Sequence, residues 1–340
     1  MGPVNGDPVT DSGIWFRVEA GSTASAVRRA AERLGEQIEM GAARIADLAI
    51  VAAELTSNLV KHADNGVLLL RPVRRAGQAG VEMVAIDSGP GMADLTVSSR
   101  DGHSTTGTLG IGLGAIVRQA SWFDGYSLPG KGTVFAVQVW PAEPATPSWA
   151  GGLTRPIPGE TVSGDGYAVR LVDGRHQVLV SDGLGHGPLA AAATEAALAA
   201  FRNAPAGAPA AVVSHLHRSM SHTRGAALAV AELAPGVLHY AGLGNISGVI
   251  VDDDGQRRGL VSLPGIAGHQ RPTVRGYDYP FGPGSRLVMH SDGVVDRWRL
   301  ADYPGLVERS PLVLAATLLR DAGTRRDDAC VLVARSGHER

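Results

Sequence analysis

Four acidic segments in the second half of the chain place aspartates beside small residues, in loops or at the ends of predicted strands. Two share the letters SDG and follow the apolar runs QVLV and RLVMH; their aspartates are Asp182 and Asp292. The others hold Asp165, in SGDG, and the pair Asp327 and Asp328. Each segment alone is typical of a turn. Together they predict a site for divalent cations, because carboxylates from separate strands supply the oxygen ligands that such ions need. Two ions can bridge a water, lower its pKa and direct it at phosphorus.

A second set of polar residues lies on a predicted helix of the first half. Glu54, Asn58 and His62 are four residues apart, so they share one helical face. A carboxylate there can accept a nucleophile's proton, and a carboxamide oxygen can hold Mg²⁺. Taken alone, the pattern is more typical of a solvated polar stripe.

Asp87, Gly89 and Gly91 come directly after the apolar strand predicted at 81–86. A carboxylate at a strand end can accept a hydrogen bond from an adenine amino group, and the glycines let the backbone approach the ring closely. An ordinary Asp-Ser-Gly turn is an equal interpretation of this segment in isolation.

Gly110, Gly112 and Gly114 lead into a further apolar helix. Glycines before a helix N-terminus leave free N–H groups and the positive end of the helix dipole for a phosphate. Flexible loops often carry the same pattern, so the combination of the three segments is the stronger signal for a nucleotide site.

Hydrophobic periodicity predicts the elements that position these residues. In the first half, helices are expected at 23–38, 41–63 and 110–120, with strands at 14–20, 66–73, 81–86, 122–127 and 132–140. Helices gathered on one side of a mostly antiparallel sheet predict an α/β sandwich.

Residues 141–152 hold three prolines and two glycines and are interpreted as a linker between domains at 13–140 and 153–335. The second half alternates short β-rich runs with helices. Strands are expected at 166–172, 177–181, 226–233, 237–241, 247–251, 285–290 and 329–334, and helices at 189–203, 208–221 and 311–322. This order predicts two packed sheets flanked by helices, and the whole chain is α+β.

Composition narrows the function classes. Hydrophobic residues make up 44% of the 340 residues and charged residues 19%, which is typical of a globular protein. A net charge of −2 without a basic block argues against nucleic acid or an anionic membrane as partner. The single cysteine, Cys330, excludes an intrachain disulfide and fits a cytoplasmic protein.

The order of ExxxN on a helix, DxGxG after a strand and GxGxG before a helix resembles the GHKL ATPase family across nearly all of residues 13–140. The segment from Asp101 to Arg118 is most similar to the RsbT-like anti-sigma and stressosome switch serine kinases. The resemblance implies that Asn58 holds the Mg²⁺ of ATP, that Asp87 contacts adenine, and that Glu54 takes the proton from a protein serine. The glycines beside adenine and phosphate would be Gly89, Gly91, Gly110, Gly112 and Gly114.

The order D, DGxGHG, SDG and DD resembles the SpoIIE/RsbX branch of the protein phosphatase 2C superfamily, across about residues 153–335. The resemblance implies an αββα sandwich and two Mn²⁺ or Mg²⁺ ions. Its ligands would be Asp165, Asp182, Asp292, Asp327 or its neighbour Asp328, and the carbonyl of Gly183. His186 would protonate the leaving oxygen, and Asp296 is expected to reach an outer metal. Asn245 is assigned no chemistry. The second aspartate of the family's first cluster is replaced by Ala168, which puts a third metal in doubt.

The two resemblances together imply a bifunctional regulator that phosphorylates serine or threonine on a STAS-domain or stressosome-like protein and also removes the phosphate. They leave a sigma factor or its regulator, and a homodimer through the first half, as further partners. The alternative is a nucleotide-sensing module that binds such a partner without phosphorylating it, attached to an active phosphatase. A gyrase-like clamp is disfavoured because no transducer domain follows.

Overall fold

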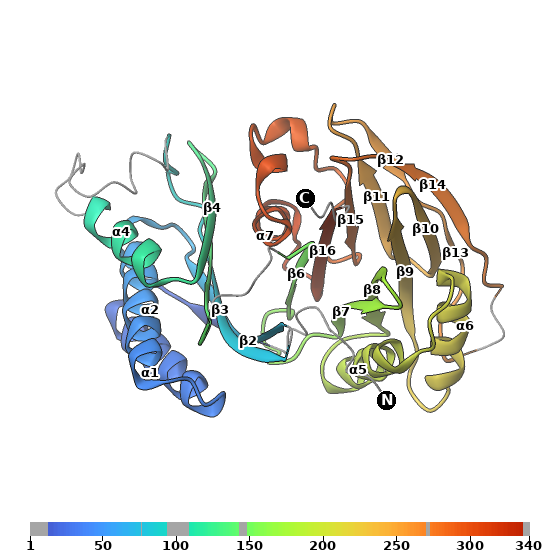
Figure 1. The fold of residues 1–340 in the computed structure, drawn as a ribbon, viewed down its shortest axis with the longest axis horizontal. Helices are drawn as coiled ribbons and strands as arrows, with labels where there is room; N and C mark the ends of the chain where they lie inside the picture. Colours follow the sequence, from blue (N-terminus) through green and yellow to red (C-terminus); the bar gives the residue numbers. More distant parts are fainter. Residues whose placement is uncertain (1–12, 76, 94–108, 143–147, 270–272, 336–340) are drawn as a thin grey trace. The chain divides into compact units, whose positions relative to one another are not determined.

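A computed structural model describes residues 13–75, 77–93, 109–142, 148–269 and 273–335 (Figure 1). These residues form two compact units, each described by itself below. One holds residues 13–142 together with Glu308–Arg320, and the other holds Ser148–Val307 and 321–335. The change of unit near Ser148 falls inside the segment interpreted as a linker.

The first unit contains one antiparallel five-stranded sheet in the order β1-β2-β3-β5-β4. Its strands are β1 (Ile14–Arg17), β2 (Val67–Arg75), β3 (Gln78–Ile86), β4 (Trp122–Leu128) and β5 (Gly132–Val139). Its helices are α1 (Gly21–Gln37), α2 (Ala42–His62) and α4 (Leu109–Gln119).

One face of this sheet packs on the helices. Along β3, Val81, Met83 and Ala85 alternate with outward neighbours, and they share a core with Leu48 and Leu55 of α2. Period-2 spacing on the strand and helical spacing on α2 therefore meet in one apolar layer. This is the α/β sandwich that the sequence predicts.

The second unit contains two sheets. The first has the order β13-β10-β9-β8-β7, with β14 also paired to β10, and the second has the antiparallel order β12-β11-β15-β16-β6. The strands of the first are β7 (Asp165–Val172), β8 (Arg175–Gly183), β9 (Ala226–Ala234), β10 (Gly236–Leu243), β13 (Ser262–Leu263) and β14 (Tyr277–Phe281). Those of the second are β6 (Ala150–Arg155), β11 (Ser247–Val251), β12 (Arg257–Gly259), β15 (Arg286–His290) and β16 (Ala329–Arg335).

Alternation along β8 shows how these layers pack. Val178 and Val180 point into a core shared with Met289 of β15 and Leu332 of β16, which joins the two sheets face to face. Leu179 points the other way, into a core with α5 (Pro188–Asn203) and α6 (Pro209–Ser219). Figure 1 shows these two helices along that outer face. The sheet is therefore buried on both sides, as a sandwich with a helical layer requires.

The remaining helical segments of the chain lie between β15 and β16. They are two short 3₁₀ turns, Leu300–Asp302 and Leu306–Glu308, and helix α7 (Pro311–Ala322). Among the described helices, none combines the length and the apolar character needed to cross a membrane.

Strand β6 is the main difference from the sequence prediction, because Ala150–Gly152 belong to it and were interpreted as linker. It pairs with β16 along its length. Tyr167 donates its hydroxyl to the Gly152 carbonyl at 2.7 Å, and its ring would lie 3.1 Å from a β-carbon at residue 152. The glycine that looked like a turn signal is needed for this ring. The short strands β12, β13 and β14 were not predicted either.

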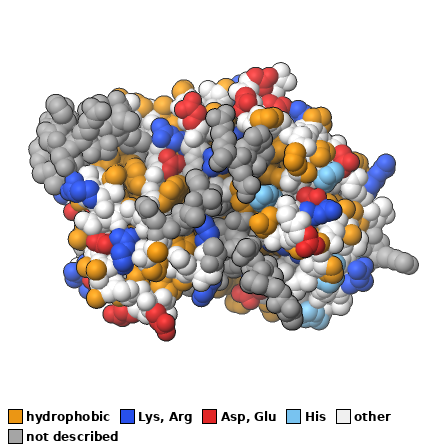
Figure 2. Space-filling model, viewed as in Figure 1, with side chains coloured by type: hydrophobic (Ala, Val, Ile, Leu, Met, Phe, Trp, Pro, Cys, Tyr) orange, Lys and Arg blue, Asp and Glu red, His pale blue; other side chains and the backbone are white. Residues whose placement is uncertain are grey.

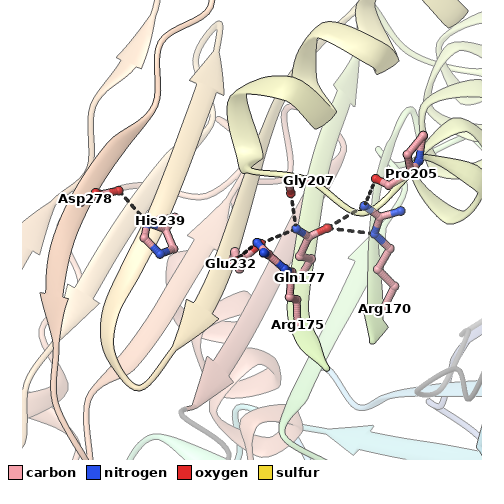
Figure 3. Close-up of polar contacts among 8 residues, drawn as sticks. All are labelled: Arg170, Arg175, Gln177, Pro205, Gly207, Glu232, His239 and Asp278. Carbon is pink, nitrogen blue, oxygen red and sulfur yellow. Dashed lines mark hydrogen bonds and ion pairs between the residues drawn. The ribbon is translucent and has the colours of Figure 1, made fainter. Parts of the chain in front are cut away.

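A buried polar network fixes the α5–α6 turn to the outer face of the sheet (Figure 3). Arg170 donates to the carbonyls of Phe201 and Ala204, at the C-terminal end of α5, over 2.6 and 2.7 Å. It also donates to the Gln177 side-chain oxygen, at 2.6 Å. Gln177 in turn donates to Glu232 at 2.6 Å and to the Gly207 carbonyl at 2.7 Å. The guanidinium thereby satisfies carbonyls that the end of the helix leaves without partners.

Arg170→Ala is expected to lower the free energy of unfolding by about 3 kcal/mol, because it leaves buried carbonyls and Gln177 without their partner. Arg175→Ala is the control. Arg175 pairs with Glu232 of the same network but its side chain is 50% exposed, so we expect a loss of less than about 1 kcal/mol. Urea unfolding followed by circular dichroism measures both, and equal losses would contradict the assignment.

Candidate functional sites

The first candidate site lies where α2 meets α4. A β-carbon placed on Gly112 would lie 2.6 Å from Glu54 Oε2 and 3.6 Å from Asn58 Oδ1. Both polar side chains are half-buried, and Thr56, between them, turns inward and donates to the carbonyl of Ala52. The shared helical face predicted for Glu54 and Asn58 therefore faces the glycine-rich helix, and a side chain at residue 112 would displace the Glu54 carboxylate.

Asp87 forms the next part of this site, directly after β3. Its Oδ1 accepts the N–H of Gly89 at 2.8 Å. Burial is the main cause that raises the pKa of Asp87 above its ordinary value, and the nearby Asp64 acts in the same direction. A β-carbon on Gly89 would lie 2.7 Å from the His62 carbonyl, so the turn lies against the end of α2. The turn therefore holds the Asp87 carboxyl group through its Oδ1.

The remaining glycines of the predicted nucleotide site differ in their setting. Gly91 has φ 69°, and a β-carbon there would lie 2.2 Å from the Leu128 carbonyl, so only glycine fits. Gly110, Gly112 and Gly114 lie inside α4 rather than before it, because the helix begins at Leu109. The start of the motif, from Asp101 to Thr108, lies outside the described residues.

The second candidate site begins with two facing aspartates of the second unit. Asp165 and Asp182 are directly opposite each other in the antiparallel pair β7–β8, and the charge of Asp182 helps to raise the pKa of Asp165. Asp165 is buried, whereas Asp182 is partly accessible. Burial raises the pKa of Asp182 to about 7, with repulsion from Asp292 and then Asp327 as further causes. The sequence predicts these residues at strand ends. In the structure they are close enough for the charge of one to shift the pKa of the other.

Ser291 holds the carboxylate of Asp165 from the other sheet. Its hydroxyl donates to Asp165 Oδ2 and accepts the N–H of Cys330 at 2.9 Å. Burial raises the pKa of Asp165 well above its usual range, followed by repulsion from Asp182, and this hydrogen bond opposes the shift. Ser291 is fully buried and bridges the two sheets. It was not identified from the sequence.

Asp292 follows β15 and is exposed. Burial of part of its carboxyl group raises its pKa, as does the neighbouring charge of Asp327. The side-chain amide of Asn245 donates to Asp292 Oδ2 at 2.7 Å and lowers that pKa. Asn245 was assigned no chemistry from the sequence, yet it orients a candidate ligand.

The structure separates Asp327 from Asp328. Both oxygens of Asp328, which is 2% exposed, accept backbone N–H groups, of Ile157 and Gly164, each at 2.7 Å. Asp328 therefore anchors the loop that leads to Asp165. Asp327 is exposed, and its Oδ1 accepts the N–H of Asp328 at 2.9 Å. This geometry favours Asp327 as the ligand of the pair.

The backbone around Gly183 is as tightly constrained as the carboxylates. A β-carbon on Gly183 would lie 2.2 Å from the carbonyl of Ala190 in α5. Its N–H donates to the Gly164 carbonyl at 3.0 Å, and Thr194 of α5 donates to the same carbonyl at 2.6 Å. The first turns of α5 therefore fix the backbone of both aspartate loops.

The structure gives His186 and Asp296 other partners. His186 is exposed, and its Nδ1 lies 3.2 Å from Glu160 Oε1, so Glu160 orients the ring. Asp296 lies 3.4 Å from an Arg257 nitrogen and 3.3 Å from His290 Nε2. Its partners are thus an arginine and a histidine rather than the other carboxylates.

The donor set around Asp182 fits a hard divalent cation. Binding of Mg²⁺ or Mn²⁺ relieves the repulsion between carboxylates. Such ions also accept a backbone carbonyl oxygen as a ligand. Among the described residues, no three His, Cys, Asp or Glu side chains are arranged as a ready-made ligand group. Mg²⁺ commonly uses one or two carboxylates and completes its shell with waters, so a looser arrangement is compatible with it.

Comparisons with known proteins match two separate parts of the chain to two different families. Residues 14–134 match the family model described as "Histidine kinase-like ATPase domain", and residues 172–336 match "Stage II sporulation protein E (SpoIIE)". The chain is 30% identical over 115 residues to the serine/threonine-protein kinase RsbT of Bacillus subtilis (strain 168), covering 34% of this chain and 86% of RsbT. A solved structure described as "The bacterial stressosome: a modular system that has been adapted to control secondary messenger signaling" is 31% identical with a TM-score of 0.51, covering 55% of this chain and 98% of the other.

Asp182→Asn is expected to stabilise the metal-free protein as the pH rises. Burial raises the folded-state pKa of Asp182 from its ordinary value of 3.8 to about 7, so the stability that this group contributes below pH 3.8 is lost as the pH rises through 7. The asparagine has no charge to lose. From pH 5 to pH 8 the advantage of the variant should grow by about 2 kcal/mol. Thermal unfolding in chelator at both pH values measures it, and an advantage that does not change with pH would contradict the coupling.

Proposed function

We propose that this chain both adds and removes phosphate on one partner protein. Its first half belongs to the RsbT family of serine/threonine-protein kinases, and its second half belongs to the SpoIIE family of serine/threonine phosphatases. The observation that carries the proposal is the group of aspartates whose charges meet around Asp182. A site for phosphate hydrolysis in the same chain as a kinase-like site points to opposed activities, whose balance would set the phosphorylation level of the partner.

For the phosphatase half, we assign Asp165, Asp182, Asp292 and Asp327 and the carbonyl of Gly183 as metal ligands. Two Mn²⁺ or Mg²⁺ ions bound there would supply an activated water. Ser291 and Asn245 hold two of the carboxylates by hydrogen bonds, and Asp328 fixes the loop before Asp165. His186, oriented by Glu160, is assigned to protonate the leaving serine oxygen.

For the kinase half, we assign Asn58 to the Mg²⁺ of ATP and Asp87 to the adenine amino group. Glu54 lies one turn before Asn58 on the same half-buried face, where it can accept the proton of a protein hydroxyl. Gly112 leaves space beside both side chains, and Gly89, Gly91, Gly110 and Gly114 complete the backbone that approaches the nucleotide. Phosphoryl transfer then depends mainly on positioning and on the charge of the ion.

The partner we propose is a STAS-domain or stressosome-like protein. The resemblance of the first half to RsbT-type kinases indicates this choice. The chain would act in the cytoplasm, with its domains at 13–140 and 153–335. The second candidate function is a nucleotide-sensing module that binds its partner, a sigma factor or its regulator, without phosphorylating it. The position of Glu54 against Asn58 and Gly112 favours an active kinase.

Two substitutions on α2 distinguish these functions. Asn58→Ala should weaken Mg-ATP binding at least about 10-fold, and Glu54→Gln should leave ATP binding intact while phosphotransfer falls about 100-fold or more, the usual scale for loss of a general base. His62→Ala, exposed on the same face, is the control. The readouts are ATP binding by calorimetry and transfer of labelled phosphate to a STAS-domain protein of the source organism. ATP binding without transfer by the unaltered chain would favour the sensing module.

Ser291→Ala is expected to weaken Mn²⁺ binding by about 10-fold, because groups that orient metal ligands typically contribute 10–100-fold in affinity. Ser181→Ala is the matched control, since Ser181 precedes the other Asp-Gly pair and its hydroxyl contacts Thr194 instead of a ligand. The increase in melting temperature on adding Mn²⁺ measures affinity independently of turnover. An unchanged Mn²⁺ response in Ser291→Ala would remove this serine from the site.

A further inference from the structure

Four large apolar side chains are exposed beside the aspartates of the second unit, three on loops and Leu189 in the first turn of α5. Val162 and Leu184 are each 38% exposed, Leu189 is 57% exposed and Ile266 is 37% exposed. Single exposed apolar side chains are ordinary on protein surfaces, and Figure 2 shows many of them among charged groups. These four differ because contacts between the segments that carry them join them into one rim, which we call the apolar rim.

The loop of Val162 adjoins the loop that carries Leu184 and leads into α5, where Leu189 lies. Glu160 contacts the ring of His186, and a β-carbon on Gly187 would lie 3.0 Å from the Glu160 carboxylate. A β-carbon on Gly164 would lie 3.3 Å from the Gly185 carbonyl. The first of these loops leads into β7, which begins with Asp165, and the second follows β8, which carries Asp182. The apolar side chains therefore border the carboxylate site.

The loop of Ile266 adjoins Leu184 from the other side. Leu184 donates its N–H to the Gly225 carbonyl at 3.1 Å. A β-carbon on Gly225 would lie 2.7 Å from Ile266 Cγ2, and Ala226 and Ala267 exchange both backbone hydrogen bonds. The apolar rim therefore continues from Val162 through Leu184 and Leu189 to Ile266.

One cation lies within this rim. Arg224 Nη1 would be 3.7 Å from a β-carbon on Gly185, and the exposed guanidinium has no hydrogen bond or ion pair with any residue that the structure describes. A guanidinium matches phosphate through two parallel hydrogen bonds. Glu160, which contacts His186 in the same loop as Gly185, disfavours acidic groups near the same place.

We propose that the apolar rim binds the chain segment on either side of a phosphoserine or phosphothreonine of a protein substrate, with apolar residues next to the phosphorylated one and Arg224 on the phosphate. This proposal rests on the phosphatase function proposed above and names the substrate class of that site. Charge complementarity supports the choice, since a phosphate attracts Arg224 while acidic flanking residues would face Glu160, which is not a metal ligand. Apolar flanking side chains gain by covering the rim.

Three synthetic phosphoserine peptides test this proposal, with leucine, glycine or glutamate at positions −2 and +2. With Mn²⁺, the unaltered chain should hydrolyse the leucine peptide with a kcat/KM at least about 10-fold above that of the glycine peptide, with the glutamate peptide slowest. The double variant Leu184→Gln, Leu189→Gln should lose this preference. It should hydrolyse p-nitrophenyl phosphate, which has no flanking residues, at the unaltered rate.

Val261→Gln is the matched control, because Val261 is 45% exposed in the same unit and lies outside the apolar rim. It should keep the leucine preference. Equal rates on the three peptides, or an equal loss on p-nitrophenyl phosphate, would overturn the proposal. Absence of Mn²⁺-dependent hydrolysis of any substrate would instead overturn the phosphatase function. In that case, the anisotropy of fluorescein-labelled peptides measures their affinity for the chain. Tighter binding of the leucine peptide that is lost in the double variant supports the proposed role of the apolar rim, and equal affinities overturn it.

Discussion

Repulsion between carboxylates held at the ends of separate strands is the constraint on which the second half of this protein depends. Asp165 and Asp182 face each other across β7 and β8, and Asp292 and Asp327 add charge from the other sheet. The pKa values of Asp165, Asp182 and Asp292 are all raised, so the folded chain keeps these groups together at a cost to its stability. Such a cost is typical of a functional site rather than of a structural one.

The surrounding fold opposes this repulsion with neutral donors. Ser291, Asn245 and the backbone N–H groups around Asp328 each hold one carboxylate, and they come from distant parts of the sequence. Helix α5 contributes through Thr194 and Ala190, which fix the glycines beside both aspartates. The sandwich thus orients the ligands through hydrogen bonds that cross between its sheets, and these contacts leave little freedom for substitution.

The elements and the main carboxylates were predictable because they depend on local patterns. Period-2 and helical spacing located α2, α5, β8 and β15 to within a few residues, and the repeated SDG located Asp182 and Asp292. Ser291 was not predictable, since its partner Asp165 lies 126 residues away. The same holds for Asn245 and for the different roles of Asp327 and Asp328. Strand β6 was missed because Gly151 and Gly152 have the composition of a linker, although Gly152 is needed beside the Tyr167 ring.

The proposed phosphatase activity requires that these carboxylates hold two divalent cations. Crystals of the whole chain grown with Mn²⁺, with anomalous diffraction measured at the manganese edge, test it directly. We predict two anomalous peaks about 3.5–4 Å apart, the usual spacing of a two-metal site, with Asp182 between them and Asp165, Asp292 and Asp327 around them. No peak near Asp182 at saturating Mn²⁺, or a peak at Asp296 or Asp328 alone, would contradict the account.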